Sequence, residues 1–121
     1  MTGTGNSTIS GLGPHGERAA APNRITLLER DIIAARDRGF SVAVAIHTLD
    51  SDWSRQSMAG IVETLDQCGA SVSEVVNCRF DPETQIAALT RLSGEPVDAV
   101  VSIPVANAAV AEAHRSVARA G

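Results

Sequence analysis

Residues 40–46 read Phe-Ser-Val-Ala-Val-Ala-Ile, a nearly continuous apolar run with β-branched side chains. The run lacks the apolar–polar alternation of a strand that has one face in water, and it is typical of a parallel strand covered on both faces. The chain has 121 residues, 44% hydrophobic and 20% charged. A chain of this size can bury one core but has no room for a second full domain. We therefore expect one layered α/β domain.

Helical and strand-like segments alternate around this run. Thr26 and Glu29 have the spacing of a capping box at a helix start, and Gly39 and Gly69 are expected to end helices. The expected order is a helix to Arg38, a strand over 40–46, a helix over 53–68, a strand over 72–77, a helix capped by Asp81 and opened by Pro82, a strand over 98–103 and a helix over 105–120. This alternation predicts a three-layer α/β/α domain with a small parallel sheet in the order 2-1-3.

Residues 1–23 are rich in Gly, Ser, Thr, Asn and Pro, and we expect a disordered or loosely docked leader. Gly11, Gly13 and Gly16 fit the dinucleotide fingerprint, but no strand precedes them and Pro14 lies inside the turn. The first basic residue is Arg18, and no apolar core follows the start, so no signal peptide is visible. No stretch reaches the roughly 20 apolar residues of a membrane span, so no direct membrane insertion is expected.

The charge balance argues against nucleic acid as a partner. All 10 basic residues are Arg and face 14 acidic residues, which gives a net charge of −4. There is no basic run, and the aromatics are only Phe40, Trp53 and Phe80. Cys68 and Cys78 have neither zinc-ligand nor redox-pair spacing, and we expect free thiols buried as small apolar side chains.

The polar loop over 47–53 is the leading candidate site, because ligands of open parallel sheets bind beyond the carboxyl ends of the strands. A sugar needs a flat apolar surface for its C–H face and polar groups for its hydroxyls. The Trp53 ring suits the first need, and the side chains of Asp50, Ser51 and Asp52 suit the second. The loops over 78–81 and 102–107 lie at the same edge, with Pro104 turning the chain after the third strand.

Other interpretations of this loop stay open. Asp52 is expected to cap the helix that starts at Trp53, and the Trp53 ring is expected to pack on the sheet edge. Both roles are compatible with ligand contact. His47, Asp50 and Asp52 as metal ligands lack a second cluster of ligands elsewhere. His47 with an Asp resembles a general acid–base pair, but no positioned nucleophile or phosphate loop accompanies it. His114 is expected to be a partly covered structural residue.

Four segments in order resemble the ribose-type periplasmic sugar-binding proteins, whose fold also occurs in the effector domains of sugar-responsive repressors. They are residues 41–53, Gly60-Ile61 with Gly69-Ala70, residues 81–86, and residues 97–104 (Val-Asp-Ala-Val-Val-Ser-Ile-Pro). The resemblance runs from about Phe40 to Gly121. It implies that residues 24–121 are part of the N-terminal lobe of a type I periplasmic binding protein.

The resemblance implies a function without catalysis or cofactor. Such a protein holds a monosaccharide or polyol between two lobes and delivers it to the permease of an ABC importer, in the periplasm or at the cell surface. Trp53 then packs on the sugar, Ser51 and Asp52 lie in the hydroxyl-binding turn, and His47 faces the cleft. Ile103 stands where the family often has a polar cleft residue. The second lobe and hinge have no counterpart here, which implies an N-terminal fragment or a truncated reading frame.

Two alternative functions remain. The effector-binding segment of a repressor requires a helix-turn-helix and a hinge helix, and the residues before Phe40 provide one short helix only. A small flavodoxin-like enzyme requires a phosphate loop after the first strand, but the acidic segment from His47 to Asp52 occupies that place.

Overall fold

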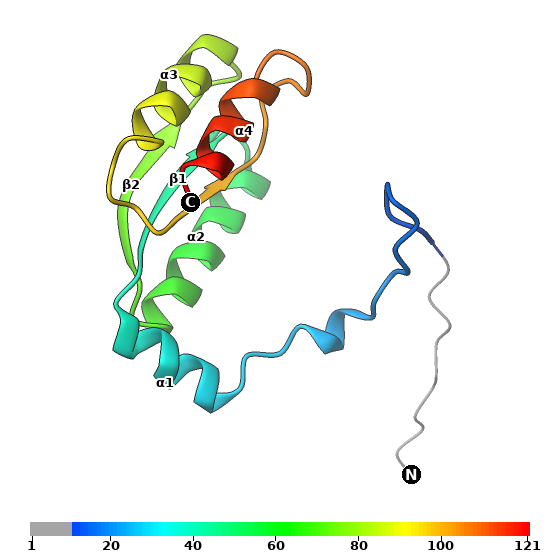
Figure 1. Ribbon diagram of the computed structural model, residues 1–121, viewed down its shortest axis with the longest axis vertical. Coiled ribbons are helices and arrows are strands. Elements are labelled where there is room, and N and C mark those ends of the chain that lie inside the picture. Colours follow the sequence, from blue (N-terminus) through cyan, green and yellow to red (C-terminus); the bar gives the residue numbers. More distant parts are fainter. Residues whose placement is uncertain (1–10) are drawn as a thin grey trace.

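The apolar run forms β1 (Ser41–Ile46), the central strand of the sheet in the computed structural model, which describes residues 11–121 (Figure 1). The other elements are α1 (Glu29–Arg38), α2 (Asp52–Gln67), β2 (Ser71–Asn77), α3 (Pro82–Leu92), β3 (Ala99–Ser102), α4 (Ala111–Arg119) and a 3-10 turn, Pro22–Arg24. The described part is an α/β domain in which four α-helices alternate with three parallel strands. The strand order β2-β1-β3 confirms the predicted topology.

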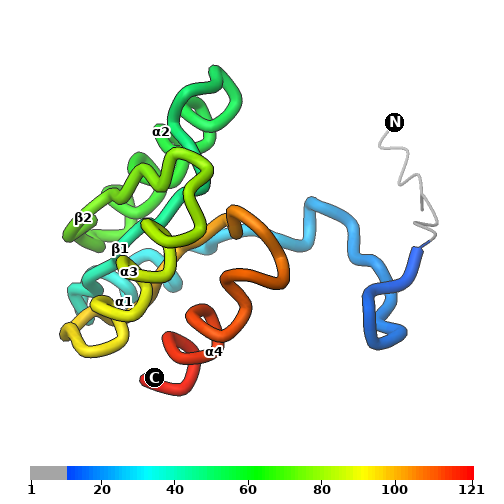
Figure 2. Tube along the Cα trace, turned by 90° about the horizontal axis from the view of Figure 1, so that it is seen from above, coloured from blue at the N-terminus to red at the C-terminus, as the bar shows by residue number. Residues whose placement is uncertain are grey.

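Both faces of β1 are buried, as the apolar run predicts. Val44 and Ile46 point to one face, where they pack with Met58 of α2. Ala45 points to the other face, where it packs with Leu89 of α3 and Ala113 of α4. Successive side chains of a strand point to opposite faces, so β1 needs apolar residues at every position. Figure 2, seen from above, shows α3 and α4 on the side of the sheet opposite α2.

The starts of two helices differ from the sequence prediction. At α1 the capping box between Thr26 and Glu29 is wrong, because the Thr26 hydroxyl donates to the Asn23 carbonyl (2.9 Å). The Asp31 carboxylate instead accepts from the Leu28 N–H (3.0 Å), which satisfies a free amide of the first turn. The last helix starts at Ala111 rather than at residue 105, because side chains of the sheet and α3 hold the preceding loop, as described below.

The predicted helix ends after α1 and α2 are confirmed. Gly39 has a left-handed backbone, with φ 60°, and its N–H donates to the Ala35 carbonyl (3.1 Å). Gly69 has φ 68°, and a Cβ added there would lie 2.6 Å from Arg36 Cγ and 3.1 Å from Arg36 Cα. A close approach between α1 and the end of α2 therefore requires glycine at this position.

The segment before α1 runs away from the sheet in both views (Figures 1 and 2). Residues 1–10 of the predicted leader lie outside the described residues. Within residues 11–23, Leu12 and Arg18 form one isolated antiparallel bridge, and the 3-10 turn has no buried residue. No helix among residues 11–121 is both long and apolar enough to cross a membrane. Cys78 is buried and Cys68 half-buried, both as free thiols, and burial raises the pKa of Cys78.

Leu89 lies fully buried between α3 and the sheet, so shortening it should create a cavity. We expect Leu89→Ala to lower the free energy of unfolding by about 2–5 kcal/mol, measured by urea denaturation. Leu12→Ala is the matched control, because that leucine is 74% exposed. Equal midpoints for the two variants would contradict the assignment of Leu89 to the core.

One ion pair makes stability depend on pH. Arg91 of α3 donates to Glu74 of β2 (2.6 Å), and this hydrogen bond holds the pKa of Glu74 below its ordinary value. Such a carboxylate adds stability above its unfolded-state pKa and loses that contribution as the pH falls through its folded-state pKa.

We therefore expect the wild-type protein to have a higher free energy of unfolding than Glu74→Gln at neutral pH. This difference should shrink as the pH falls below the ordinary pKa of a carboxylate. Urea midpoints measured across the acidic range test this, with Glu63→Gln, on the exposed side of α2, as control for the loss of one charge. A difference that grows on acidification would contradict the role of the pair.

Candidate functional site

The loops after β1 and β2 are joined to each other at the carboxyl edge of the sheet. The His47 carbonyl accepts from the Phe80 N–H (2.8 Å), which continues the strand pairing by one step. The Asn77 side-chain oxygen accepts from the backbone N–H of Leu49 (3.2 Å) and of Arg79 (3.1 Å). One amide side chain therefore holds a backbone group from each loop, and the side chains that follow are brought to one place.

Three rings meet at this edge. The His47 ring lies edge-on to Trp53, with centroids 6.1 Å apart and planes at 63°. It is also edge-on to Phe80, at 5.4 Å and 75°. Both distances are typical of favourable edge-to-face pairs. We name His47, Trp53 and Phe80 the aromatic cluster. Trp53 is 61% exposed and Phe80 60% exposed, so the cluster presents two ring surfaces to solvent around a half-buried histidine.

A strained turn presents the Phe80 ring. Arg79 and Phe80 both have left-handed backbones, with φ of 51° and 57°. This conformation costs a residue with a side chain roughly 1–2 kcal/mol. The turn persists because Asn77 fixes the Arg79 N–H and the His47 carbonyl fixes the Phe80 N–H. Residues in such backbones gather at functional sites, and here the strain places an apolar ring in water beside His47.

The two nitrogens of His47 are in different environments. Nδ1 is buried and has no hydrogen-bond partner among the described residues. A buried N–H without an acceptor is rarer in proteins than an acceptor with a spare lone pair. We therefore assign the proton of the neutral ring to Nε2, which gives the cluster a hydrogen-bond donor.

The polar residues of the first loop differ in how their side chains are used. Ser51, not Asp52, is the N-cap of α2, and its hydroxyl accepts from the Ser54 N–H (3.1 Å). The predicted cap at Asp52 is therefore wrong by one residue. The Asp52 carboxylate instead pairs with Arg55, because both side chains lie on the exposed side of the first turn. Asp50 is exposed, and its backbone N–H donates to the Thr48 hydroxyl (3.1 Å).

Gln85 of α3 fixes the loop after β3. Its side chain is fully buried, with Nε2 2.9 Å from the Ile103 carbonyl and 3.3 Å from the Ala45 carbonyl. Its Oε1 accepts from the Val105 N–H (2.8 Å). Pro104, the residue between these two backbone partners, is exposed. Gln85 therefore ties the end of β1 to the β3–α4 loop that contains Pro104.

A second pair of side chains supports the same loop from α4. His114 Nε2 lies 2.9 Å from the Ser102 hydroxyl, and its Nδ1 lies 2.8 Å from the Val110 carbonyl. A ring that donates from Nδ1 and accepts at Nε2 satisfies both bonds. The half-buried His114 is thus held between strand and helix, as expected for a structural residue.

The chain's own side chains cap α2 and α3 at this edge, whereas the start of α4 has no side-chain cap. Ser51 caps α2, and the Asp81 carboxylate accepts from the Glu83 N–H (3.2 Å) at the start of α3. The hydrogen bond from Thr84 lowers the pKa of Asp81, which keeps this carboxylate ionised. Within residues 11–121, no three His, Cys, Asp or Glu side chains lie close enough to hold a metal ion.

The structure thus gathers only part of the predicted site. The His47 and Trp53 rings meet, and Asp50, Ser51 and Asp52 lie between these two residues in the chain. Phe80 and Gln85 are additional residues that the sequence interpretation did not assign to the site. Phe80 could have been found from the sequence, because it is one of only three Phe, Trp or Tyr residues and lies in the loop after a predicted strand. Gln85 looked like an ordinary helical residue, and its burial follows from the tertiary structure.

The comparisons with known proteins identify no relative. No family model matches the chain, and no curated protein or solved structure matches it.

The hydrogen bonds of Gln85 predict a measurable cost when they are removed. Gln85→Leu keeps the volume but leaves the Ile103 carbonyl and the Val105 N–H without this partner. We expect a loss of about 1–3 kcal/mol in unfolding free energy and faster hydrogen exchange at the Val105 amide. Gln56→Leu, at an exposed position of α2, is the matched control. Unchanged exchange at Val105 would show that Gln85 does not hold the loop.

Proposed function

We propose that this chain is the ligand-binding part of a solute-binding protein of an ABC importer, and that it binds a neutral sugar or polyol at the aromatic cluster. The proposal rests on one observation above all. Trp53 and Phe80, from different loops, expose more than half of their surface beside His47. Exposed aromatic rings of this kind suit the C–H face of a sugar ring, which needs a flat apolar surface.

Hydrogen-bonding groups suited to hydroxyls surround the rings. Asp50 offers a carboxylate acceptor on the loop that carries Trp53, and the Nε2–H of His47 is a donor. The carboxylate of Asp52 is shared with Arg55. The Ser51 hydroxyl is already used to cap α2, so its contribution to a ligand is smaller than that of its neighbours. In this proposal Pro104 shapes the adjacent loop.

The electrostatics support a neutral ligand over a phosphate. Helix starts bind phosphate through free amide groups, and at α2 and α3 the side chains of Ser51 and Asp81 each already accept from one of these amides. The carboxylates of Asp50 and Asp81 would also repel an anion at this edge. These features disfavour a nucleotide or flavin phosphate here. They are consistent with the neutral sugar or polyol that the resemblance of residues 40–121 to the ribose-type binding proteins implies.

A panel of monosaccharides and polyols, titrated by calorimetry, tests the proposal directly. We expect at least one to bind, and Trp53→Ala to weaken that binding by about 1–3 kcal/mol because a stacking surface is lost. Equal affinity of wild type and Trp53→Ala would show that the Trp53 ring does not contact the ligand. Binding of flavin mononucleotide in place of every sugar would favour the enzyme alternative.

The part played by Phe80 is tested by keeping an apolar side chain while removing the ring. Phe80→Leu should weaken sugar binding by about 0.5–1.5 kcal/mol, whereas Phe40→Leu, before β1 at the other end of the sheet, should leave the affinity unchanged. Equal effects of the two substitutions would indicate a general loss of structure and not a contact with the ligand.

A further inference from the structure

Asn77, the last residue of β2, uses both acceptor positions of its side-chain oxygen within the chain. Oδ1 accepts from the Leu49 N–H (3.2 Å) and from the Arg79 N–H (3.1 Å). An amide oxygen has two lone pairs, so neither is left for a ligand. The two bonds also fix the orientation of the amide, because turning it over would place the Nδ2 protons against two other N–H groups.

The nitrogen of the same amide is free. Within residues 11–121, Asn77 Nδ2 bonds no other group, and it is not one of the buried polar atoms that lack a partner. Asn77 is half-buried, so its Nδ2 reaches the surface with two donor protons. A donor whose direction is already fixed suits ligand recognition, because little freedom is lost when the ligand binds.

This donor lies on the face of the sheet that α2 covers. Asn77 pairs with Ile46, and residues in register on neighbouring strands point to the same face. Ile46 packs with Met58 of α2. Trp53 is in the first turn of α2, and Phe80 follows Asn77 by three residues. The Asn77 amide is therefore situated between the loops that carry the two exposed rings.

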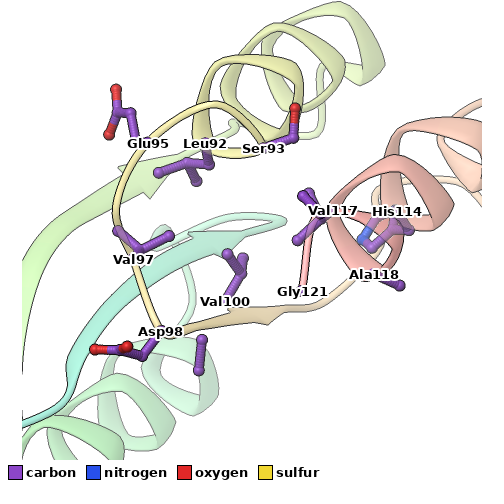
Figure 3. A pocket seen from close by; sticks show the side chains of 12 residues that line it. Leu92, Ser93, Glu95, Val97, Asp98, Val100, His114, Val117, Ala118 and Gly121 are labelled. Atoms are coloured by element: carbon purple, nitrogen blue, oxygen red, sulfur yellow. The ribbon is translucent and has the colours of Figure 1, made fainter.

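The hollow between α3, β3 and α4 offers no comparable group. Figure 3 shows apolar side chains from three elements, Leu92, Val100 and Val117, converging on this hollow of about 310 Å³. The polar side chains that line it already have partners within the chain, and these are Ser93, Glu95, Asp98 and His114. A free and oriented donor distinguishes the region of the aromatic cluster from this hollow.

We propose that Asn77 has two separable roles in the proposed sugar site. Its Oδ1 positions the loops of Trp53 and Phe80, and its Nδ2 donates to an oxygen of the sugar or polyol. The second role rests on the proposed function, whereas the first concerns the protein alone. Apolar rings accept many C–H faces, so a directed donor beside them decides which arrangement of oxygens fits. Asn77 is thus a specificity-determining residue.

Two substitutions separate these roles. Asn77→Asp keeps the shape and the acceptor for both N–H groups but removes the donor, and Asn77→Leu removes both. We expect hydrogen exchange at the Leu49 and Arg79 amides to keep its wild-type rate in Asn77→Asp and to become about tenfold faster in Asn77→Leu. Unchanged exchange in Asn77→Leu would overturn the positioning role.

Calorimetry with D-glucose, D-galactose, D-ribose and myo-inositol tests the donor role. For the probe that binds wild type most tightly, both variants should lose about tenfold in affinity, because one hydrogen bond to the ligand is lost. Asn107→Asp is the matched control, because Asn107 is exposed in the loop after β3 and the change adds the same charge at the same edge. It should alter neither affinity nor exchange. Equal affinity of wild type and Asn77→Asp would overturn the donor role.

NMR of the side-chain amides separates this proposal from the proposed function. The Nδ2 proton signals of Asn77 should shift when the binding probe is added, whereas those of Asn107 should not. A probe that binds without shifting the Asn77 signals would overturn the donor role and leave the proposed function intact. If no probe binds to wild type, the donor role fails together with the proposed function, and the exchange rates still decide the positioning role.

Discussion

The Gln85 side chain connects the sheet to the loops at its carboxyl edge. The side chain is fully buried. It donates to the carbonyls of Ala45 in β1 and Ile103 after β3, and it accepts from the Val105 N–H. A buried amide is stabilising only when its donors and acceptor are satisfied, so these backbone groups and Gln85 depend on one another. The same edge carries the aromatic cluster, because β1 leads directly from Ala45 to His47. Gln85 thus fixes the β3–α4 loop against β1, while Asn77 joins the two loops that carry the aromatic cluster.

Much of the fold could be predicted because it depends on local patterns. Every residue from Val42 to Ile46 is apolar and buried, as expected for a strand that is covered on both faces. Glycines at residues 39 and 69 marked the helix ends by the same local logic. The starts of α1 and α4 were wrong because they depend on tertiary or competing local contacts. The Leu28 N–H donates to the Asp31 carboxylate and the Thr26 hydroxyl donates to the Asn23 carbonyl. Gln85 bonds Ile103 and Val105, which holds the segment before α4 out of the helix.

The candidate site was less predictable than the fold. Sequence reasoning found the loop with His47 and Trp53, because a polar loop after a buried strand is a local signal. The contribution of Phe80 depends on two left-handed residues in succession and on the Asn77 side chain that fixes them. No propensity predicts that combination, since neither Arg79 nor Phe80 is a glycine. The N-cap of α2 could not be assigned from sequence either. Ser and Asp are equally common N-caps, and only the structure shows that Ser51 has this role.

The central claim is that the rings of Trp53 and Phe80 form the sugar surface. Saturation-transfer difference NMR with short saturation times tests it most directly, because brief irradiation of the few aromatic resonances of this chain chiefly marks ligand protons that lie against them. With a sugar or polyol that binds, the account predicts strong transfer to its C–H protons from the rings of Trp53 and Phe80, and loss of that transfer in a variant without them. Transfer that arises instead from the methyl groups around Val100 and Val117, with the aromatic resonances silent, would contradict it.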